Sequence, residues 1–182
     1  MASWVQRMVG AAKLDVATYE EVEADSNATV QAMGVVLLSA VAAGIGDIGH
    51  GGRGIIVGAS IALIAWVAWA LVTWLIGTKF LAEPETNADV GQLMRTIGFA
   101  AAPGLLRVFG WIPILGNLVA VVAMLWMLAA MVVAVRQALD YKGTGRAILV
   151  CFIGWCINLT VLFTLGALLG VAILGVKSMT GS

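Results

Sequence analysis

Residues 54–75, GIIVGASIALIAWVAWALVTWL, decide the fold, because this stretch holds no charged side chain. Residues 29–46, 111–135 and 147–176 share that property. A helix of about 18 or more apolar residues is long enough to cross the bilayer core of about 30 Å. The sequence therefore predicts an all-α fold, a polytopic transmembrane helix bundle.

The composition is typical of an integral membrane protein. The 182 residues are 62% hydrophobic and 11% charged, with a formal net charge of zero. Such a chain has room for about four or five spans, so we expect no separate soluble catalytic domain. Zero net charge does not favour nucleic acid as a partner. The expected partners are the lipid bilayer, other membrane proteins and a second copy of the chain.

Residues 90–106 form a shorter apolar stretch that ends just before Arg107. A helix of about 17 residues would be about 25 Å long, the lower limit for a crossing. Arg95 and Arg107 would then extend toward the two membrane surfaces, and Pro103 marks an expected helix break. A re-entrant or interfacial helix is the alternative.

The placement of Lys and Arg favours five spans with a cytoplasmic amino terminus, because cytoplasmic loops are enriched in these residues. Five spans put seven of them inside and three outside, whereas four spans divide them six to four. The seven are Arg7, Lys13, Lys79, Arg95, Arg136, Lys142 and Arg146, and the three are Arg53, Arg107 and Lys177. We predict spans at about 27–46, 54–80, 90–106, 111–135 and 147–176 of the cytoplasmic (inner) membrane, with the short tail 177–182 outside.

Residues 1–26 form a cytoplasmic segment with an amphipathic part followed by an acidic part. Its apolar stripe at helical spacing consists of Trp4, Val5, Met8, Val9 and Ala12. Beside a span, such a helix is expected to lie in the membrane interface, and docking to a partner is the alternative. No cleavable signal is evident, so the first span is expected to act as the targeting element.

The loop 136–146, RQALDYKGTGR, is a second candidate contact region on the cytoplasmic side. Asp140 follows Arg136 by four residues, which allows an ion pair if the helix continues. Arg146 adds a further charge.

Ionisable groups inside spans usually mark function in membrane proteins, and the four long stretches have none. The loop residues Asp47, His50 and Arg53 form the only cluster with acid–base character, without the further ligands or nucleophile of a metal or catalytic site. We therefore expect no enzymatic activity, no cofactor and no metal.

Two features concern helix packing. The pairs Gly54/Gly58 and Gly166/Gly170 have the small-xxx-small spacing that lets helices approach closely. The indoles of Trp66, Trp69, Trp126 and Trp155 lie inside the predicted spans, where we expect them to pack with the N–H bonded to a neighbour.

Three stretches carry a family resemblance: DVATYEEVEADSNAT (residues 15–29), LMRTIGFAAAPGLLRVFGWIPILG (residues 93–116) and VAVRQALDYKGTGRAILVCFIGW (residues 133–155). With the spacing of the spans, the chain resembles the prokaryotic branch of the Yip-domain (Ypt-interacting-protein-like) membrane proteins. The resemblance implies a five-helix membrane domain with a cytoplasmic amino terminus. Eukaryotic members are linked to vesicle trafficking through small GTPases, and the family supplies no catalytic residues.

These patterns predict a non-enzymatic membrane adaptor or organiser, or an accessory subunit of a larger membrane protein assembly. Its contact residues would lie on the cytoplasmic face, at Trp4, Met8, Arg136, Asp140 and Arg146. The alternative is a transporter or channel for an uncharged or lipid-like solute, with a cavity at Pro103 that Asn158 or Thr160 faces.

Overall fold

A computed structural model describes residues 2–47, 55–113, 115–160 and 164. Every regular element in this part of the chain is helical. Three helices are long and apolar enough to cross a membrane: α3 (Ala28–Gly46), the continuous segment Ile55–Phe80, and α6 (Leu115–Ala138). The segment Ile55–Phe80 consists of α4 (Ile55–Leu75) and a π-helical turn, η2 (Ile76–Phe80). The predictions of an all-helical fold and of membrane-crossing helices are thus confirmed at this level.

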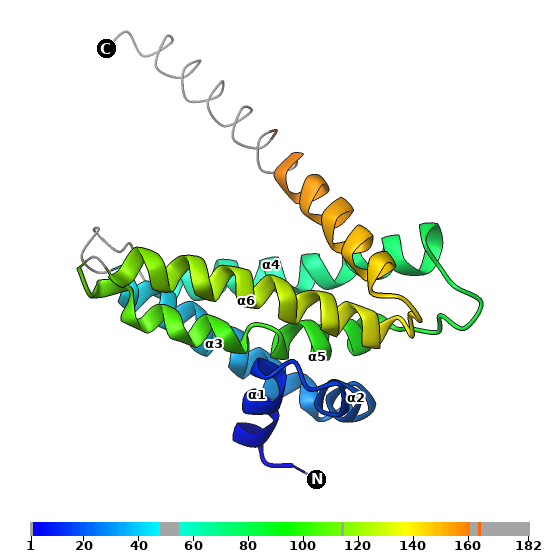
Figure 1. Ribbon diagram of the computed structural model, residues 1–182, viewed down its shortest axis with the longest axis horizontal. Helices are drawn as coiled ribbons and strands as arrows, with labels where there is room; N and C mark the ends of the chain where they lie inside the picture. Colours follow the sequence, from blue (N-terminus) through cyan, green and yellow to red (C-terminus); the bar gives the residue numbers. More distant parts are fainter. Residues whose placement is uncertain (1, 48–54, 114, 161–163, 165–182) are drawn as a thin grey trace, which may run out of the picture.

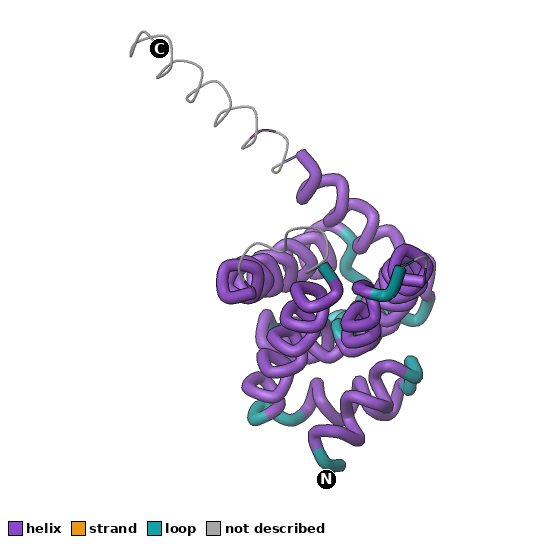
Figure 2. The backbone as a smooth tube through the Cα atoms, turned by 90° about the vertical axis from the view of Figure 1, so that its left-hand side faces the viewer, coloured by secondary structure: helices purple, strands orange, loops and turns teal. Residues whose placement is uncertain are grey.

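The long helices lie side by side along the longest axis of the molecule (Figure 1). Between α4 and α6 in the chain come α5 (Val90–Phe99) and the 3₁₀ helix η3 (Ala102–Trp111). The short helices α1 (Trp4–Ala12) and α2 (Val16–Ala24) form a hairpin on one flank of the bundle, which Figure 2 shows from the end. A further helix, Thr144–Thr160, leaves the bundle obliquely after α6.

Residues 90–106 do not form the single helix that the sequence predicts. The helix α5 ends at Phe99, a turn follows at Ala100 and Ala101, and Pro103 lies in the first turn of η3. Proline has no N–H for the α-helical ladder, and its ring would clash with the carbonyl of Phe99. The next long helix starts at Leu115 rather than at residue 111, because residue 111 still belongs to η3.

Segment α5–η3 packs closely along the whole of α3. A Cβ atom built on Gly98 would lie 2.7 Å from the Cβ of Ala32, one on Gly104 would collide with Ser39, and one on Gly46 would collide with the backbone of η3. The contacts advance together along both segments, so α3 and α5–η3 run in the same direction. Segment α5–η3, which contains the shortest predicted span, residues 90–106, therefore lies alongside α3 from Ala32 to Gly46.

Of the four glycines expected to bring helices together, only Gly58 lies in the described residues, and it does not do so. No atom lies within 4 Å of a Cβ built on Gly58, which therefore packs against no other helix in the described part of the chain. Gly54, Gly166 and Gly170 lie outside the described residues. Close approach depends instead on small residues that α3 and α5–η3 place opposite one another.

Tryptophan indoles connect the elements through hydrogen bonds to backbone carbonyls. The N–H of Trp66 donates to Met94 at 2.9 Å, and that of Trp126 donates to Ala12 at 2.7 Å, as the sequence predicts for indoles inside the spans. Trp155 is exposed, and the buried N–H of Trp69 has no partner among the described residues. Two indoles nearer the helix ends act in the same way: Trp4 donates to Gln31, and Trp74 donates to Ala88.

Candidate functional site

A buried arginine holds the α1–α2 hairpin together. The Arg7 side chain is only 2% exposed, and its guanidinium pairs with Glu21 at 2.9 Å and with Asp25 at 2.8 Å. It also donates to the side-chain oxygen of Gln31 on α3 at 3.0 Å. Such charge-assisted hydrogen bonds are the strong ones in proteins. One cation thus joins the carboxyl-terminal half of α2 to α1 and to the start of α3.

The same contacts lower the pKa values of the two acids. The bond from Arg7 is the main cause for Asp25, whose pKa lies below its usual value. For Glu21, the backbone N–H of Ala2 has the larger effect and Arg7 the next. Both carboxylates therefore stay charged, and the hairpin stays closed, over the neutral pH range.

The orientation of α1 follows from this network. Arg7 and Ala11 face the protein, so the apolar side of the helix faces outward, with Val5 61% and Val9 47% exposed. Trp4 is at the edge of this surface, and Met8 is half-buried. We call the surface made by Trp4, Val5 and Val9 the α1 face. An outward apolar surface on a fixed element suits lipid or another apolar protein surface.

The hairpin is attached to the bundle at the carboxyl end of α2. Arg95 of α5 is 8% exposed, and its Nε donates to the carbonyls of Val22 at 3.1 Å and Glu23 at 3.0 Å. The last carbonyls of a helix have no partner within the helix, and the helix dipole places negative charge there. The sequence-based expectation that Arg95 extends toward a membrane surface is therefore wrong, because its guanidinium binds the carboxyl end of α2.

Polar bonds from two more helices reinforce the attachment. Gln92 of α5 donates to the carboxylate of Glu23 at 3.1 Å, and Gln137 of α6 donates to Glu20 at 3.2 Å. With the bond from Trp126 to Ala12, the hairpin is held by α3, α5 and α6 together. The α1 face is consequently held in one orientation relative to the bundle.

Glu23 titrates near neutrality at this junction. Burial raises its pKa to about 7, and the nearby carboxylates of Asp140, Glu20 and Asp89 act in the same direction, while Arg95 opposes them. The junction of α2, α5 and α6 therefore changes its charge near pH 7.

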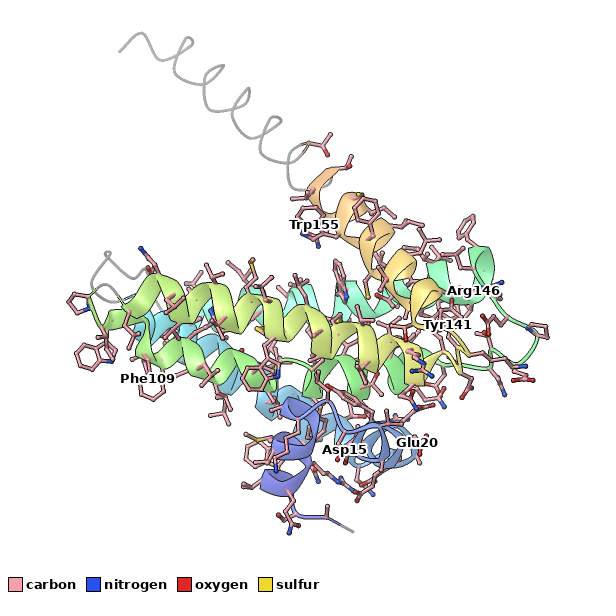
Figure 3. All side chains as sticks on the ribbon, viewed as in Figure 1. Asp15, Glu20, Phe109, Tyr141, Arg146 and Trp155 are labelled. Atoms are coloured by element: carbon pink, nitrogen blue, oxygen red, sulfur yellow. The ribbon has the colours of Figure 1, made fainter. Side chains whose placement is uncertain are left out.

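A second polar cluster lies at the end of the bundle that carries Tyr141 and Arg146 (Figure 3). Arg146 pairs with Glu83 at 3.1 Å, and Lys142 pairs with Glu85 at 2.9 Å. The hydroxyl of Tyr141 donates to the carbonyls of Gly77 and Leu81, both at 3.0 Å. These bonds close the end of the bundle by joining the link after α6 to the segment after α4.

The expected ion pair between Arg136 and Asp140 does not form. The helix α6 ends at Ala138, and Asp140 has a positive φ of 52°, so the four-residue helical spacing is lost. Arg136 instead donates to the carbonyl of Tyr141 at 3.3 Å, and this bond stabilises the turn after the helix. Of the predicted contact residues, Arg136 and Arg146 thus form bonds within the protein, and the Arg146 side chain is 49% exposed.

Of the other sequence candidates, those that the structure describes are not brought together. Asp47 follows α3 directly, whereas His50 and Arg53 lie outside the described residues. Within the described ranges, no three His, Cys, Asp or Glu residues are placed to hold a metal. Pro103 is buried against α3, while Asn158 and Thr160 are exposed on the oblique helix, so these residues do not share a cavity.

Sequence patterns could have located two of the helix starts that position this site. Ser3 and Gln6 form a complete capping box on α1, and Asp89 and Gln92 form one on α5. Both pairs have the three-residue spacing of this motif. Nothing local could have revealed the role of Arg95, because its partners lie more than 70 positions earlier in the chain.

Comparison of the chain with models of known protein families, with curated proteins and with solved structures finds no match. The structure itself defines the class: its described residues are all-helical and contain three helices able to cross a membrane, which indicates a membrane protein.

Proposed function

We propose that the protein is a non-enzymatic adaptor or organiser in the cytoplasmic membrane, or an accessory subunit of a larger membrane assembly, related to the Yip-domain proteins. The observation that carries this proposal is the α1 face. It is apolar, it points outward, and it belongs to a hairpin held in place by buried ion pairs and hydrogen bonds. A surface fixed before binding loses little conformational entropy when a partner docks.

We further propose five spans with the hairpin on the cytoplasmic side. The α5–η3 segment supports a third crossing, because it lies alongside α3 from Ala32 to Gly46. Helix η3 adds about 2.0 Å per residue, more than an α-helix, so the broken segment covers nearly the length of its neighbours. The charged pairs beside Tyr141 suit the cytoplasmic face.

The test is a pull-down from membranes in mild detergent, with a photo-crosslinking residue placed next to the α1 face. The double variant Val5→Asn/Val9→Asn should lose a partner or oligomer that the natural chain captures reproducibly. Val57→Asn/Ile64→Asn is the matched control, because these residues are also exposed but lie on α4, and no hydrogen bond joins α4 to the hairpin among the described residues. The control variant should keep the partner.

Two results would overturn the proposal. One is equal loss of the captured protein in both variants, which would assign the contact to general apolar association. The other is a clean monomer that conducts a solute after reconstitution into liposomes, which would make transport the function.

A further inference from the structure

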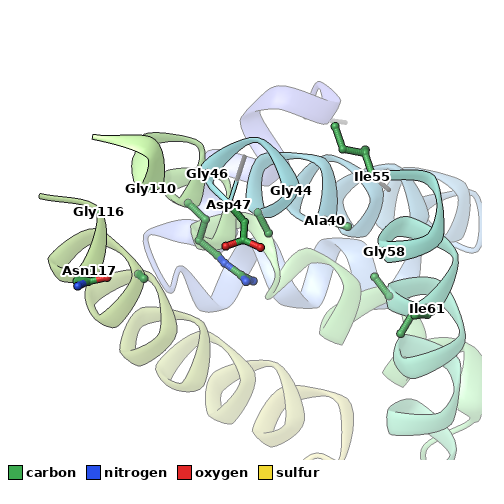
Figure 4. Close-up of a pocket in the computed structure, with 14 residues that line it drawn as sticks. Ala40, Gly44, Gly46, Asp47, Ile55, Gly58, Ile61, Gly110, Gly116 and Asn117 are labelled. Atoms are coloured by element: carbon green, nitrogen blue, oxygen red, sulfur yellow. The ribbon is translucent and has the colours of Figure 1, made fainter. Parts of the chain in front are cut away.

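We propose that the cavity at the end of the bundle away from Tyr141 binds one anionic phospholipid, with an acyl chain inside the cavity and the phosphate at Arg107. The cavity lies between α3, α4, η3 and α6 (Figure 4) and has a volume of about 610 Å³. That volume falls within the range of about 300–1,000 Å³ typical of ligand sites.

The walls of the cavity suit a hydrocarbon chain. They are made almost entirely of glycine and alanine, with two isoleucines: Ala40, Ala43, Gly44, Gly46, Ile55, Gly58, Ile61, Ala62, Gly110, Gly116 and Ala120. Two of these glycines, Gly46 and Gly116, pack directly against backbone atoms of η3, so a larger side chain would not fit at either position. Atoms that line an empty apolar cavity lose dispersion contacts. In a bilayer, the acyl chain of a neighbouring lipid can fill the cavity and restore these contacts.

The mouth of the cavity suits an anionic headgroup. Its polar lining residues are Asp47, Arg107 and Asn117. Within the described part of the chain, no hydrogen bond or ion pair engages the Arg107 guanidinium, whereas Asp47 already has a partner. A guanidinium matches phosphate oxygens through two parallel hydrogen bonds, so Arg107 supplies charge complementarity.

Neighbouring aromatic residues place this mouth at headgroup depth. Phe109, labelled in Figure 3, and Trp111 are both exposed beside Arg107 at the same end of the bundle. Tryptophan is enriched at the boundary between hydrocarbon and headgroups, where an arginine also finds phosphate. A lipid whose phosphate lies at Arg107 would therefore have its chains at the level of the cavity.

Native mass spectrometry of the full chain in detergent tests the proposal, with phosphatidylglycerol and phosphatidylcholine of the same acyl chains as probes. We expect one phosphatidylglycerol to be retained at least about tenfold better than phosphatidylcholine. Arg107→Gln should remove this preference. Gly58→Leu should abolish retention of both lipids, because the new side chain enters the open space of the cavity without meeting a neighbour.

Lys13→Gln is the matched control, since it removes an exposed positive charge from the hairpin rather than from the cavity, and it should bind like the natural chain. Three outcomes would each overturn the proposal: no preference for phosphatidylglycerol in the natural chain, a preference that survives in Arg107→Gln, or full retention in Gly58→Leu. Displacement of the phospholipid by inorganic phosphate alone would also overturn it, because the site would then recognise only the anion.

Discussion

Replacement of Arg95 by methionine tests how the hairpin is attached to the bundle. Methionine keeps most of the apolar length of the side chain but removes the guanidinium. The carbonyls of Val22 and Glu23 then lose their donor at the end of α2. A hydrogen bond to a charged group contributes about 1.5–3 kcal/mol. Bonds to two neighbouring carbonyls do not add fully, so we expect a cost of about 3 kcal/mol.

This cost should appear as local opening rather than global unfolding. Each 1.4 kcal/mol is about a tenfold change in an equilibrium constant, so the open population of the hairpin should rise about 100-fold. Hydrogen exchange of the α2 amides, measured by mass spectrometry in lipid nanodiscs, reports this population directly. Exchange in α3 and α6 should stay unchanged.

Arg146→Met is the matched control, because Arg146 bonds to Glu83 and to the carbonyl of Ala82 at the end of the bundle and does not touch the hairpin. It should leave α2 exchange as in the natural chain. The reasoning fails if Arg95→Met speeds α2 exchange by less than about threefold, or if α2 and α6 accelerate together.

Three further predictions follow from the same structure. Gly98→Leu should lower the free energy of unfolding by about 1–3 kcal/mol in detergent, while Gly58→Leu, in open space, should not. Docking raises the pKa of Glu23 from 4.5 to about 7, so docking of the hairpin should weaken between pH 5 and pH 8. Hydrogen exchange of the α2 amides, corrected for the intrinsic pH dependence of exchange, should become faster over this range. In Glu23→Gln the corrected exchange should not depend on pH. Cysteine labelling should place position 142 in the cytoplasm and position 177 outside; labelling of both from one side would contradict five spans.

The sign of the pH effect follows from proton binding. Between pH 4.5 and about 7, the docked state binds a proton at Glu23 that the undocked state has already released. Docking therefore loses stability as pH rises through this window and changes no further above it. The lowered pKa values of Glu21 and Asp25 act in the opposite way and weaken the hairpin only in acid.

The long helices could be predicted accurately from the sequence, because the pattern that indicates them is local. The first predicted span, 27–46, agrees with α3 (Ala28–Gly46) to within one residue, and the second, 54–80, agrees with the continuous segment Ile55–Phe80. Length and apolar composition determine both, and neither depends on what packs beside the helix. The broken form of α5–η3 was harder to predict, because the turn comes three residues before the proline that marks it.

Sequence periodicity also identified the apolar stripe of α1, but the side that it faces depends on tertiary contacts. Arg7 turns inward because Glu21, Asp25 and Gln31 meet it from α2 and α3. Arg95 likewise finds its acceptors on a helix far away in the chain. A pattern in the sequence gives the spacing of side chains. The free-energy cost of burying a charge is offset only by ion-pair and hydrogen-bond partners, and the fold brings these partners together. The sequence by itself therefore determined a helical membrane protein, and the tertiary structure decided which of its charges are buried and which apolar surface is left for a partner.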